Sequence, residues 1–158
     1  MRMTRRLFLT LPLVLTACAT QNPDLPTYAS AERSLAPPAP GTARLYFYRL
    51  LDPNDPQLGT TVMLNEKPVG FSRTGTVFYR DVPPGSYFIS VLSPGPYPFQ
   101  FKTVDVQAGQ TWYFRIESLP SWAFSGSRGG NRGDTFVVAI VDPLQARIEI
   151  APLGLLSG

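Results

Sequence analysis

Cys18 is the residue of this 158-residue chain best suited to covalent chemistry, because it is the only cysteine. A lone thiol cannot form an intramolecular disulfide. The chain has no histidine, which removes the usual general base and the commonest zinc ligand. Its carboxylates are scattered, and no spacing fixes a pair suited to acid–base work. The sequence therefore predicts no catalytic residue, no metal site and no cofactor, and it favours a protein that is not an enzyme.

The segment before Cys18 predicts what the thiol is for. Arg2, Arg5 and Arg6 precede an apolar stretch, residues 7–15, which is typical of an export signal. A stretch of about nine residues is too short for a membrane-spanning helix, which needs roughly 20. Residues 15–18, Leu-Thr-Ala-Cys, resemble the lipobox of bacterial lipoproteins. The resemblance implies a signal peptide over 1–17 and lipidation of Cys18; the alternative is an ordinary signal peptide with a coincidental cysteine.

The same leader leaves the export route open. Residues 4–9, Thr-Arg-Arg-Leu-Phe-Leu, resemble the twin-arginine motif through Arg5 and Arg6. Adjacent arginines also occur by chance in the leaders of the general secretory route. Ala19 is not the aspartate that retains such lipoproteins in the inner membrane. We therefore expect a protein anchored in the outer membrane and facing the periplasm.

The leader also accounts for the net charge. The full chain has 14 basic and 11 acidic side chains, but three of the arginines lie before Cys18. From Cys18 onward the charges balance at 11 of each sign. A neutral domain without a basic stripe is a poor candidate for nucleic-acid binding, and we expect none.

Composition divides the rest of the chain into a tether, a domain and a tail. Residues 18–41 are rich in proline and polar side chains, which predicts an extended membrane tether. Residues 42–152 predict one all-β domain, a single antiparallel β-sandwich of about seven to eight strands, and 153–158 a C-terminal tail. The evidence is a series of short β-prone runs bounded by proline and glycine, with no helical stripe. The runs are 43–50, 60–64, 69–71, 76–82, 86–92, 99–106, 112–117, 135–141 and 147–150.

The order of the runs resembles a known group of proteins. The pattern combines Tyr-Phe-Tyr-Arg at 46–49, Val-Pro-Pro-Gly-Ser-Tyr at 82–87 and Ala-Gly-Gln-Thr-Trp-Tyr at 108–113. It is similar to small bacterial lipoproteins that carry a β-sandwich domain of unknown function. The Pro-Gly-Ser-Tyr turn also resembles PEGA-type and carboxypeptidase-regulatory-like modules, which are adhesive or structural. The resemblance implies no activity and supplies no catalytic residue.

Two glycines and a set of tyrosines have alternative interpretations. Gly85 and Gly109 are expected in tight turns that need a residue without a Cβ. The tyrosines could form an exposed strip that stacks on sugar rings, or half-buried packing with hydroxyls at the rim. They are Tyr46, Tyr48, Tyr79, Tyr87 and Tyr113.

Residues 119–134 form the one long loop expected inside the domain. Loops beyond about 12 to 15 residues are usually functional or disordered. The functional hypothesis is an interaction loop in which aromatic side chains anchor a partner and arginines meet carboxylates or phosphates; the alternative is a plain hairpin extension. The residues concerned are Trp122, Phe124, Arg128 and Arg132.

Together these features predict a lipid-anchored protein of the bacterial envelope with a non-catalytic binding or assembly role in the periplasm. Its expected partners are the membrane, through lipidated Cys18, and an envelope protein or peptidoglycan. The alternative function is a peptidoglycan- or glycan-binding module that uses exposed tyrosine and tryptophan side chains.

Overall fold

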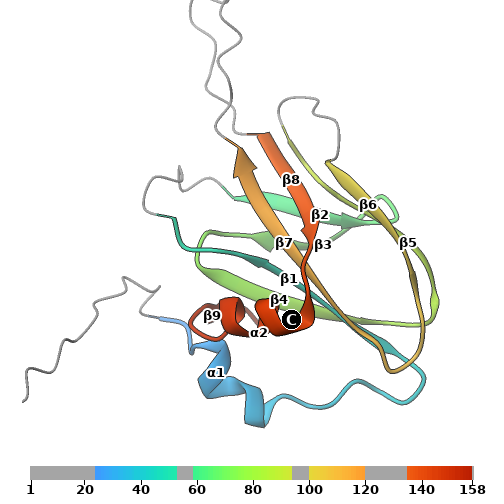
Figure 1. Cartoon of the computed structure of the whole chain (residues 1–158), viewed down its shortest axis with the longest axis horizontal. Coiled ribbons are helices and arrows are strands. Elements are labelled where there is room, and N and C mark those ends of the chain that lie inside the picture. The colour runs from blue at the N-terminus through green and yellow to red at the C-terminus, as the bar shows by residue number, and fades with distance from the viewer. Residues whose placement is uncertain (1–23, 53–58, 94–99, 120–134, 158) are drawn as a thin grey trace, which may run out of the picture.

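A computed structural model describes residues 24–52, 59–93, 100–119 and 135–157, and these form a sandwich of two β-sheets. The first sheet has the strand order β8-β7-β1-β4-β9 and the second has the order β3-β2-β5-β6 (Figure 1). The strands are β1 Ala43–Arg49, β2 Thr60–Leu64, β3 Lys67–Ser72, β4 Thr76–Val82, β5 Gly85–Val91, β6 Phe101–Val106, β7 Thr111–Leu119, β8 Thr135–Ile140 and β9 Gly154–Leu155. The predicted all-β sandwich is confirmed.

Most strand pairs are antiparallel, but two in the first sheet are not. β1 pairs with β7 in parallel, with Tyr46 opposite Tyr113, and β4 pairs in parallel with β9. The sequence predicted antiparallel pairing throughout. The difference arises because the first sheet is completed by segments distant in the chain, which a tight hairpin cannot join.

The core between the sheets is built from alternating side chains. Trp112, Phe114 and Ile116 of β7 share the face that packs against the second sheet, whereas Tyr113 lies on the other face. Phe47 stacks between Phe78 and Phe114. Its ring centroid lies 5.2 Å from that of Phe78 and 5.4 Å from that of Phe114. Aromatic and β-branched residues at every second position therefore hold the two sheets together.

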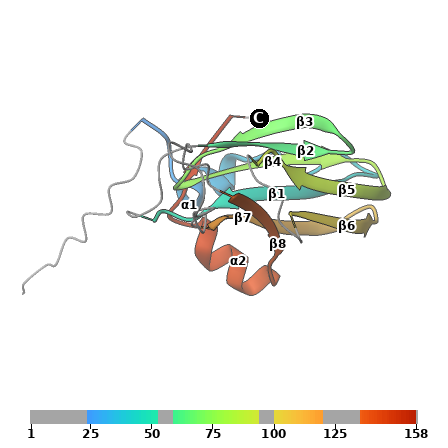
Figure 2. The same cartoon turned by 90° about the horizontal axis from the view of Figure 1, so that it is seen from above.

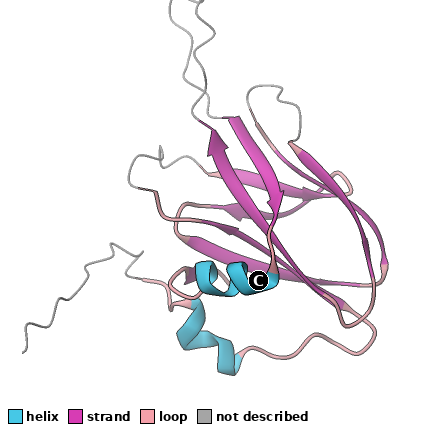
Figure 3. Ribbon diagram, in the orientation of Figure 1, coloured by secondary structure: helices cyan, strands magenta, loops and turns pink. Residues whose placement is uncertain are grey.

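The first sheet is buried on both faces. All seven residues of β1 are buried, including Arg44 and Arg49. A second cluster on its outer face joins Tyr46, Tyr48 and Tyr113 to residues outside the predicted domain. Helices α1, Tyr28–Ala31, and α2, Pro143–Ile150, cover this face (Figure 3). A 3₁₀ turn, Glu32–Ser34, continues α1.

The predicted strand over 147–150 is wrong, because this segment belongs to α2. The Asp142 carboxylate accepts hydrogen bonds from the amides of Leu144 and Gln145, at 2.9 and 3.4 Å. Pro143 occupies the first turn, where its missing N–H costs nothing. Capping by Asp142 and Pro143 therefore starts a helix where alternation alone indicated a strand.

The predicted tether and tail are wrong where they are described. Tyr28 is only 6% exposed, and its amide donates to the Leu153 carbonyl at 2.7 Å. The Ala29 amide donates to the Ala151 carbonyl at 3.0 Å. Gly154–Leu155 forms β9 beside β4, so the expected tail completes the first sheet. The folded unit therefore extends from about Pro26 to Leu155, because both chain ends supply the cover that the first sheet needs.

Of the two glycines predicted to occupy tight turns, one has the backbone conformation that requires glycine and the other does not. Gly109 has φ +79°, in the left-handed region that glycine adopts at no cost. Gly85 is the first residue of β5 and has no left-handed φ; a Cβ there would lie 3.7 Å from the Tyr87 ring, an ordinary contact. The structure therefore confirms the conformational requirement at Gly109 and contradicts it at Gly85.

These two glycines make a matched pair for a stability test. We expect Gly109→Ala to lower the free energy of unfolding by about 1 kcal/mol, because alanine is strained at positive φ. Gly85→Ala is expected to change it by less than about 0.5 kcal/mol. Denaturant unfolding measures both. Equal effects of the two substitutions would contradict the backbone assignment.

Candidate functional site

The residues that the sequence singled out for chemistry lie outside the described ranges. Cys18, Arg5 and Arg6 belong to residues 1–23, and the predicted interaction loop, 119–134, lies outside the described ranges except for its first residue, which ends β7. Lipidation, export and the loop hypothesis therefore stay predictions. The loop residues concerned are Trp122, Phe124, Arg128 and Arg132.

The tyrosines predicted as either packing or an exposed strip are packed. Tyr46, Tyr48 and Tyr113 are 5%, 1% and 4% exposed. The rings of Tyr46 and Tyr113 stack with centroids 5.2 Å apart, and the Tyr28 hydroxyl donates to the Tyr46 hydroxyl at 3.1 Å. Tyr79 and Tyr87 are half-buried. The buried members therefore cannot stack on a sugar ring, and the packing interpretation is confirmed for them.

Arg44 is a buried cation with a complete set of partners. Its Nε and Nη2 donate to the two oxygens of Asp81 at 2.7 and 2.8 Å, and its guanidinium lies 4.0 Å from the centroid of the Tyr79 ring. The hydrogen bonds to Asp81 raise the pKa of Arg44 despite the opposing effect of burial. This bidentate pair joins β1 to β4, which is a structural role for both groups.

A second polar cluster joins α2 to the first sheet. The Tyr48 hydroxyl donates to Glu149 Oε2 at 2.5 Å, while Arg115 Nη1 and Gln145 Nε2 donate to Oε1 at 2.8 and 2.7 Å. Burial acts to raise the pKa of Glu149, but the hydrogen bonds from Tyr48 and Gln145 and the charge of Arg115 outweigh it and lower the pKa. A carboxylate stabilised in its ionised form is a poor general base, so this cluster is best suited to holding α2 in place.

The described ranges contain neither a candidate metal cluster nor a helix that could span a membrane. No group of three or more histidine, cysteine, aspartate or glutamate side chains in these ranges is placed to hold a metal ion. None of the helices in the same ranges is long and apolar enough to cross a membrane.

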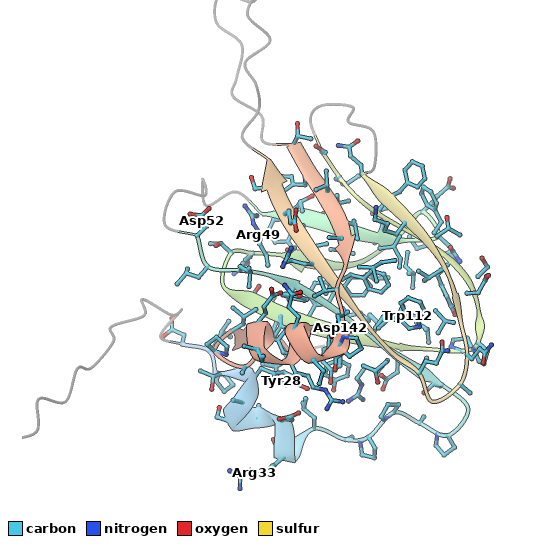
Figure 4. The ribbon with its side chains drawn as sticks, viewed as in Figure 1. Tyr28, Arg33, Arg49, Asp52, Trp112 and Asp142 are labelled. Atoms are coloured by element: carbon cyan, nitrogen blue, oxygen red, sulfur yellow. The ribbon has the colours of Figure 1, made fainter. Side chains whose placement is uncertain are left out.

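A hollow of about 380 Å³ lies where β8 ends and the chain turns into α2. Trp112 and Ile140 give it apolar walls, and Thr111 and Asp142 add polar groups. Figure 4 labels Trp112 and Asp142. The indole N–H of Trp112 donates to Gln110 Oε1 at 3.0 Å, which fixes the ring orientation. A small polar ligand with one apolar face fits this composition.

The outer face of the second sheet carries the largest uncovered group of apolar side chains in the described ranges. Phe71, Phe88, Leu92 and Phe101 are 46%, 36%, 57% and 52% exposed. The rings of Phe88 and Phe101, on neighbouring strands, have centroids 5.0 Å apart. We call these four residues the open face. They project from the side of the sheet opposite to Ile89, Val91 and Val104, which enter the core.

The open face is not among the sites predicted from the sequence, although two of the predicted strands carry apolar residues on both faces. The runs 86–92 and 99–106 place phenylalanine at 88 and 101, on the face opposite the core valines. Alternation normally puts polar residues there. Apolar residues on both faces of a strand indicate that both faces are covered, by another layer or by a partner. In the described ranges no helix or strand covers the outer face of the second sheet (Figure 1).

Sequence comparison matches most of the domain to one protein family. A family model described as a protein of unknown function, DUF2846, matches residues 39–130. No curated protein matches the chain. The matched residues include all four strands of the second sheet, whereas α1, β8, α2 and β9 lie outside them.

The Glu149 cluster predicts a pH-dependent stability. The folded state lowers the pKa of Glu149 below its ordinary value of 4.5, so its stabilising contribution is complete above about pH 4.5 and is lost as pH falls through the lower folded value. We expect Glu149→Gln to cost about 1–2 kcal/mol at pH 7, with the difference from the parent shrinking below pH 4.5. Denaturant unfolding between pH 7 and pH 3 measures this.

Glu66→Gln, in the exposed turn between β2 and β3, is the matched control. It removes the same charge without breaking the cluster, and we expect little change at any pH. A constant deficit for Glu149→Gln across the whole range would contradict the proposed pH dependence.

Proposed function

The chain belongs to the DUF2846 family, whose function is unknown, and we propose that it is a lipid-anchored, non-catalytic protein of the bacterial envelope that binds a protein partner through its open face. The observation that carries this proposal is the contrast between the two sheets. The first sheet has its outer face covered by α1 and α2, whereas the second exposes Phe71, Phe88, Leu92 and Phe101.

The composition of the open face supports a protein partner. Contiguous exposed apolar patches are uncommon on monomeric proteins and mark interaction sites. Uncharged Ser90 and Thr103 lie opposite Phe101 and Phe88 across the β5–β6 pair, while charged Asp105 lies farther along β6. Aromatic residues with few charges at the centre and charges at the rim are characteristic of protein interfaces. The open face lies wholly within the residues that the family model matches, so the strands that carry it belong to the domain shared by the family.

The leader supports the location. Residues 1–17 have the composition of an export signal, and Cys18 follows a lipobox-like sequence. Acylation at Cys18 would supply more than one hydrocarbon chain, which anchors a protein far more firmly than a single chain does. We place the domain in the periplasm on the outer membrane, because Ala19 is not the aspartate of inner-membrane retention. The similarity to small bacterial lipoproteins and PEGA-type modules is part of this proposal.

A second candidate function is binding of peptidoglycan or another glycan. The observation that favours it is the hollow beside Trp112, where an oriented indole lies among Gln110, Thr111 and Asp142. Aromatic rings with nearby hydrogen-bonding groups suit a sugar ring. Tyr113 also lines the hollow but is only 4% exposed, so this candidate site depends on Trp112 for ring stacking.

Replacement of Cys18 by serine tests the anchor. We expect Cys18→Ser to move the protein from the membrane fraction to the soluble fraction and to abolish labelling by a fatty-acid analogue, because serine cannot form the thioether. Fractionation and metabolic labelling of intact cells measure the two effects. Membrane association without any label in the parent protein would contradict the lipoprotein assignment.

Photocrosslinking in intact cells tests the open face. A photoreactive phenylalanine at position 88 or 101 preserves an aromatic side chain, and we expect it to give an adduct of discrete mass that protease degrades. The same probe at Ser34, exposed on the helical side, is the control and should give no such adduct. Equal adducts at all three positions would contradict a specific site. Capture of the protein in boiled, detergent-washed sacculi would instead support the glycan alternative.

A further inference from the structure

We propose that β6 binds the protein partner by strand addition. An extended segment of the partner pairs with the outer edge of β6, places apolar side chains beside the open face and brings a carboxylate to Lys102. This inference rests on the proposed protein partner and adds the way in which that partner is bound.

The first observation is that β6 is an edge strand. The second sheet ends at β3 on one side and at β6 on the other (Figure 2). Within the described ranges β6 pairs with β5 and with no other strand. Every second residue of an edge strand turns its N–H and C=O groups away from the sheet, where they can pair with another extended chain.

The hydrogen bonds around Phe88 identify the outward-facing groups of β6. The Asn65 amide donates to the Phe88 carbonyl at 2.8 Å, and the Phe88 amide donates to Asn65 Oδ1 at 2.7 Å. Both backbone groups of Phe88 therefore point toward β2 and away from β6. Thr103 lies opposite Phe88, so its N–H and C=O point away from β5. By alternation, the backbone groups of Phe101 and Asp105 point the same way.

Solvent reaches this edge. Phe101, Thr103 and Asp105, whose backbone groups point outward, are all exposed. Between them, Val104 points its side chain into the core and is 6% exposed. The strand is therefore held by the core on one face, while its outer edge is open to a partner in the described ranges.

The other sheet edges are covered or interrupted. β3 contains Pro68, which has no N–H, and its register with β2 shifts beside this residue. β4 is paired with β9 at one end, and farther along Arg80 Nη1 donates to the Tyr79 carbonyl at 2.7 Å. In β8, Phe136 is 3% exposed and its amide donates to Ser93 Oγ at 3.1 Å. Among the described strands, β6 has neither a proline nor a register shift on its edge.

The open face continues to the edge of β6. Phe101 lies on this strand, and its ring centroid is 5.0 Å from that of Phe88 on β5. A strand added to β6 would lie about 4.8 Å away, and alternate side chains would project on the side of Phe101. Apolar side chains at these positions would cover the exposed rings, so the partner needs an alternating apolar pattern.

Lys102 restricts which strand can be added. Its side chain lies on the core side of β6, is half-buried and has no ion pair in the described ranges. An inward-facing charge on an edge strand opposes pairing with an apolar strand. A second copy of β6 also fits poorly, because Asp105 lies on the other face and cannot meet Lys102 when the open faces of two copies are aligned. A foreign strand with aspartate or glutamate opposite Lys102 neutralises the charge.

Proline at position 103 tests the pairing in the full-length protein in intact cells. Thr103→Pro removes an N–H that the fold does not use, and proline is tolerated on the outer edge of a sheet but blocks an added strand. A photoreactive phenylalanine at position 101 reports binding. We expect Thr103→Pro to lower the yield of the discrete protein adduct about tenfold or more, because a backbone hydrogen bond is lost and the proline ring obstructs the approach. Thr103→Val, the matched control, keeps the N–H and should keep the adduct.

Lys102 gives an independent test, which decides the question if proline at position 103 destabilises the fold. Lys102→Glu reverses the charge without changing a backbone group, and we expect it to lower the adduct yield severalfold, whereas Lys102→Arg should retain it. Thermal unfolding of the purified variants checks that each is folded.

The outcomes separate this proposal from the proposed function. An undiminished adduct in folded Thr103→Pro or in Lys102→Glu overturns strand addition by an acidic segment and leaves the open face as a binding site. Absence of an adduct in the parent protein overturns both. An adduct of twice the mass of the protein would assign the edge to a second copy and would also overturn the proposal.

Discussion

The packing of Tyr28 on the outer face of the first sheet is the contact on which the arrangement of this protein depends. A sheet with tyrosines on one face and phenylalanines on the other must be covered twice, because both sets bury large apolar surfaces. The second sheet covers the phenylalanines. The tyrosines are covered by segments from the two ends of the described chain: Tyr28 donates its hydroxyl proton to Tyr46, and its backbone binds the segment after α2. The chain ends therefore act as one layer, and each holds the other in place.

This second cover makes the two sides of the domain different. On one side the polar groups are satisfied internally: Arg44 is paired with Asp81, and Glu149 accepts hydrogen bonds from three side chains. On the other side the second sheet leaves Phe88 and Phe101 exposed. The difference between the two sides thus follows from a single structural feature, namely that residues 26–35 belong to the domain.

Much of the fold could be predicted from alternation, and the exceptions have identifiable causes. The runs 60–64 and 76–82 match β2 and β4, because both are short β-prone runs bounded by turn residues. The error at 147–150 could have been avoided from Asp142-Pro143, which is a recognised helix start. Residues 28–34 could not have been predicted as helical, since so short a helix is unstable alone and depends on Tyr28 and its tertiary contacts. For the site, the sequence directed attention to Cys18 and Trp122, whereas the open face required knowing which strand faces are covered.

Amide hydrogen exchange tests most directly whether residues 26–35 are folded onto the domain. The amides of Tyr28 and Ala29 donate to Leu153 and Ala151, and β1 supplies an internal reference for stable strand amides. If the segment is docked, both amides exchange orders of magnitude more slowly than an unstructured peptide of the same sequence. Exchange of Tyr28 and Ala29 at the rate of unstructured chain, while β1 stays protected, would contradict the account.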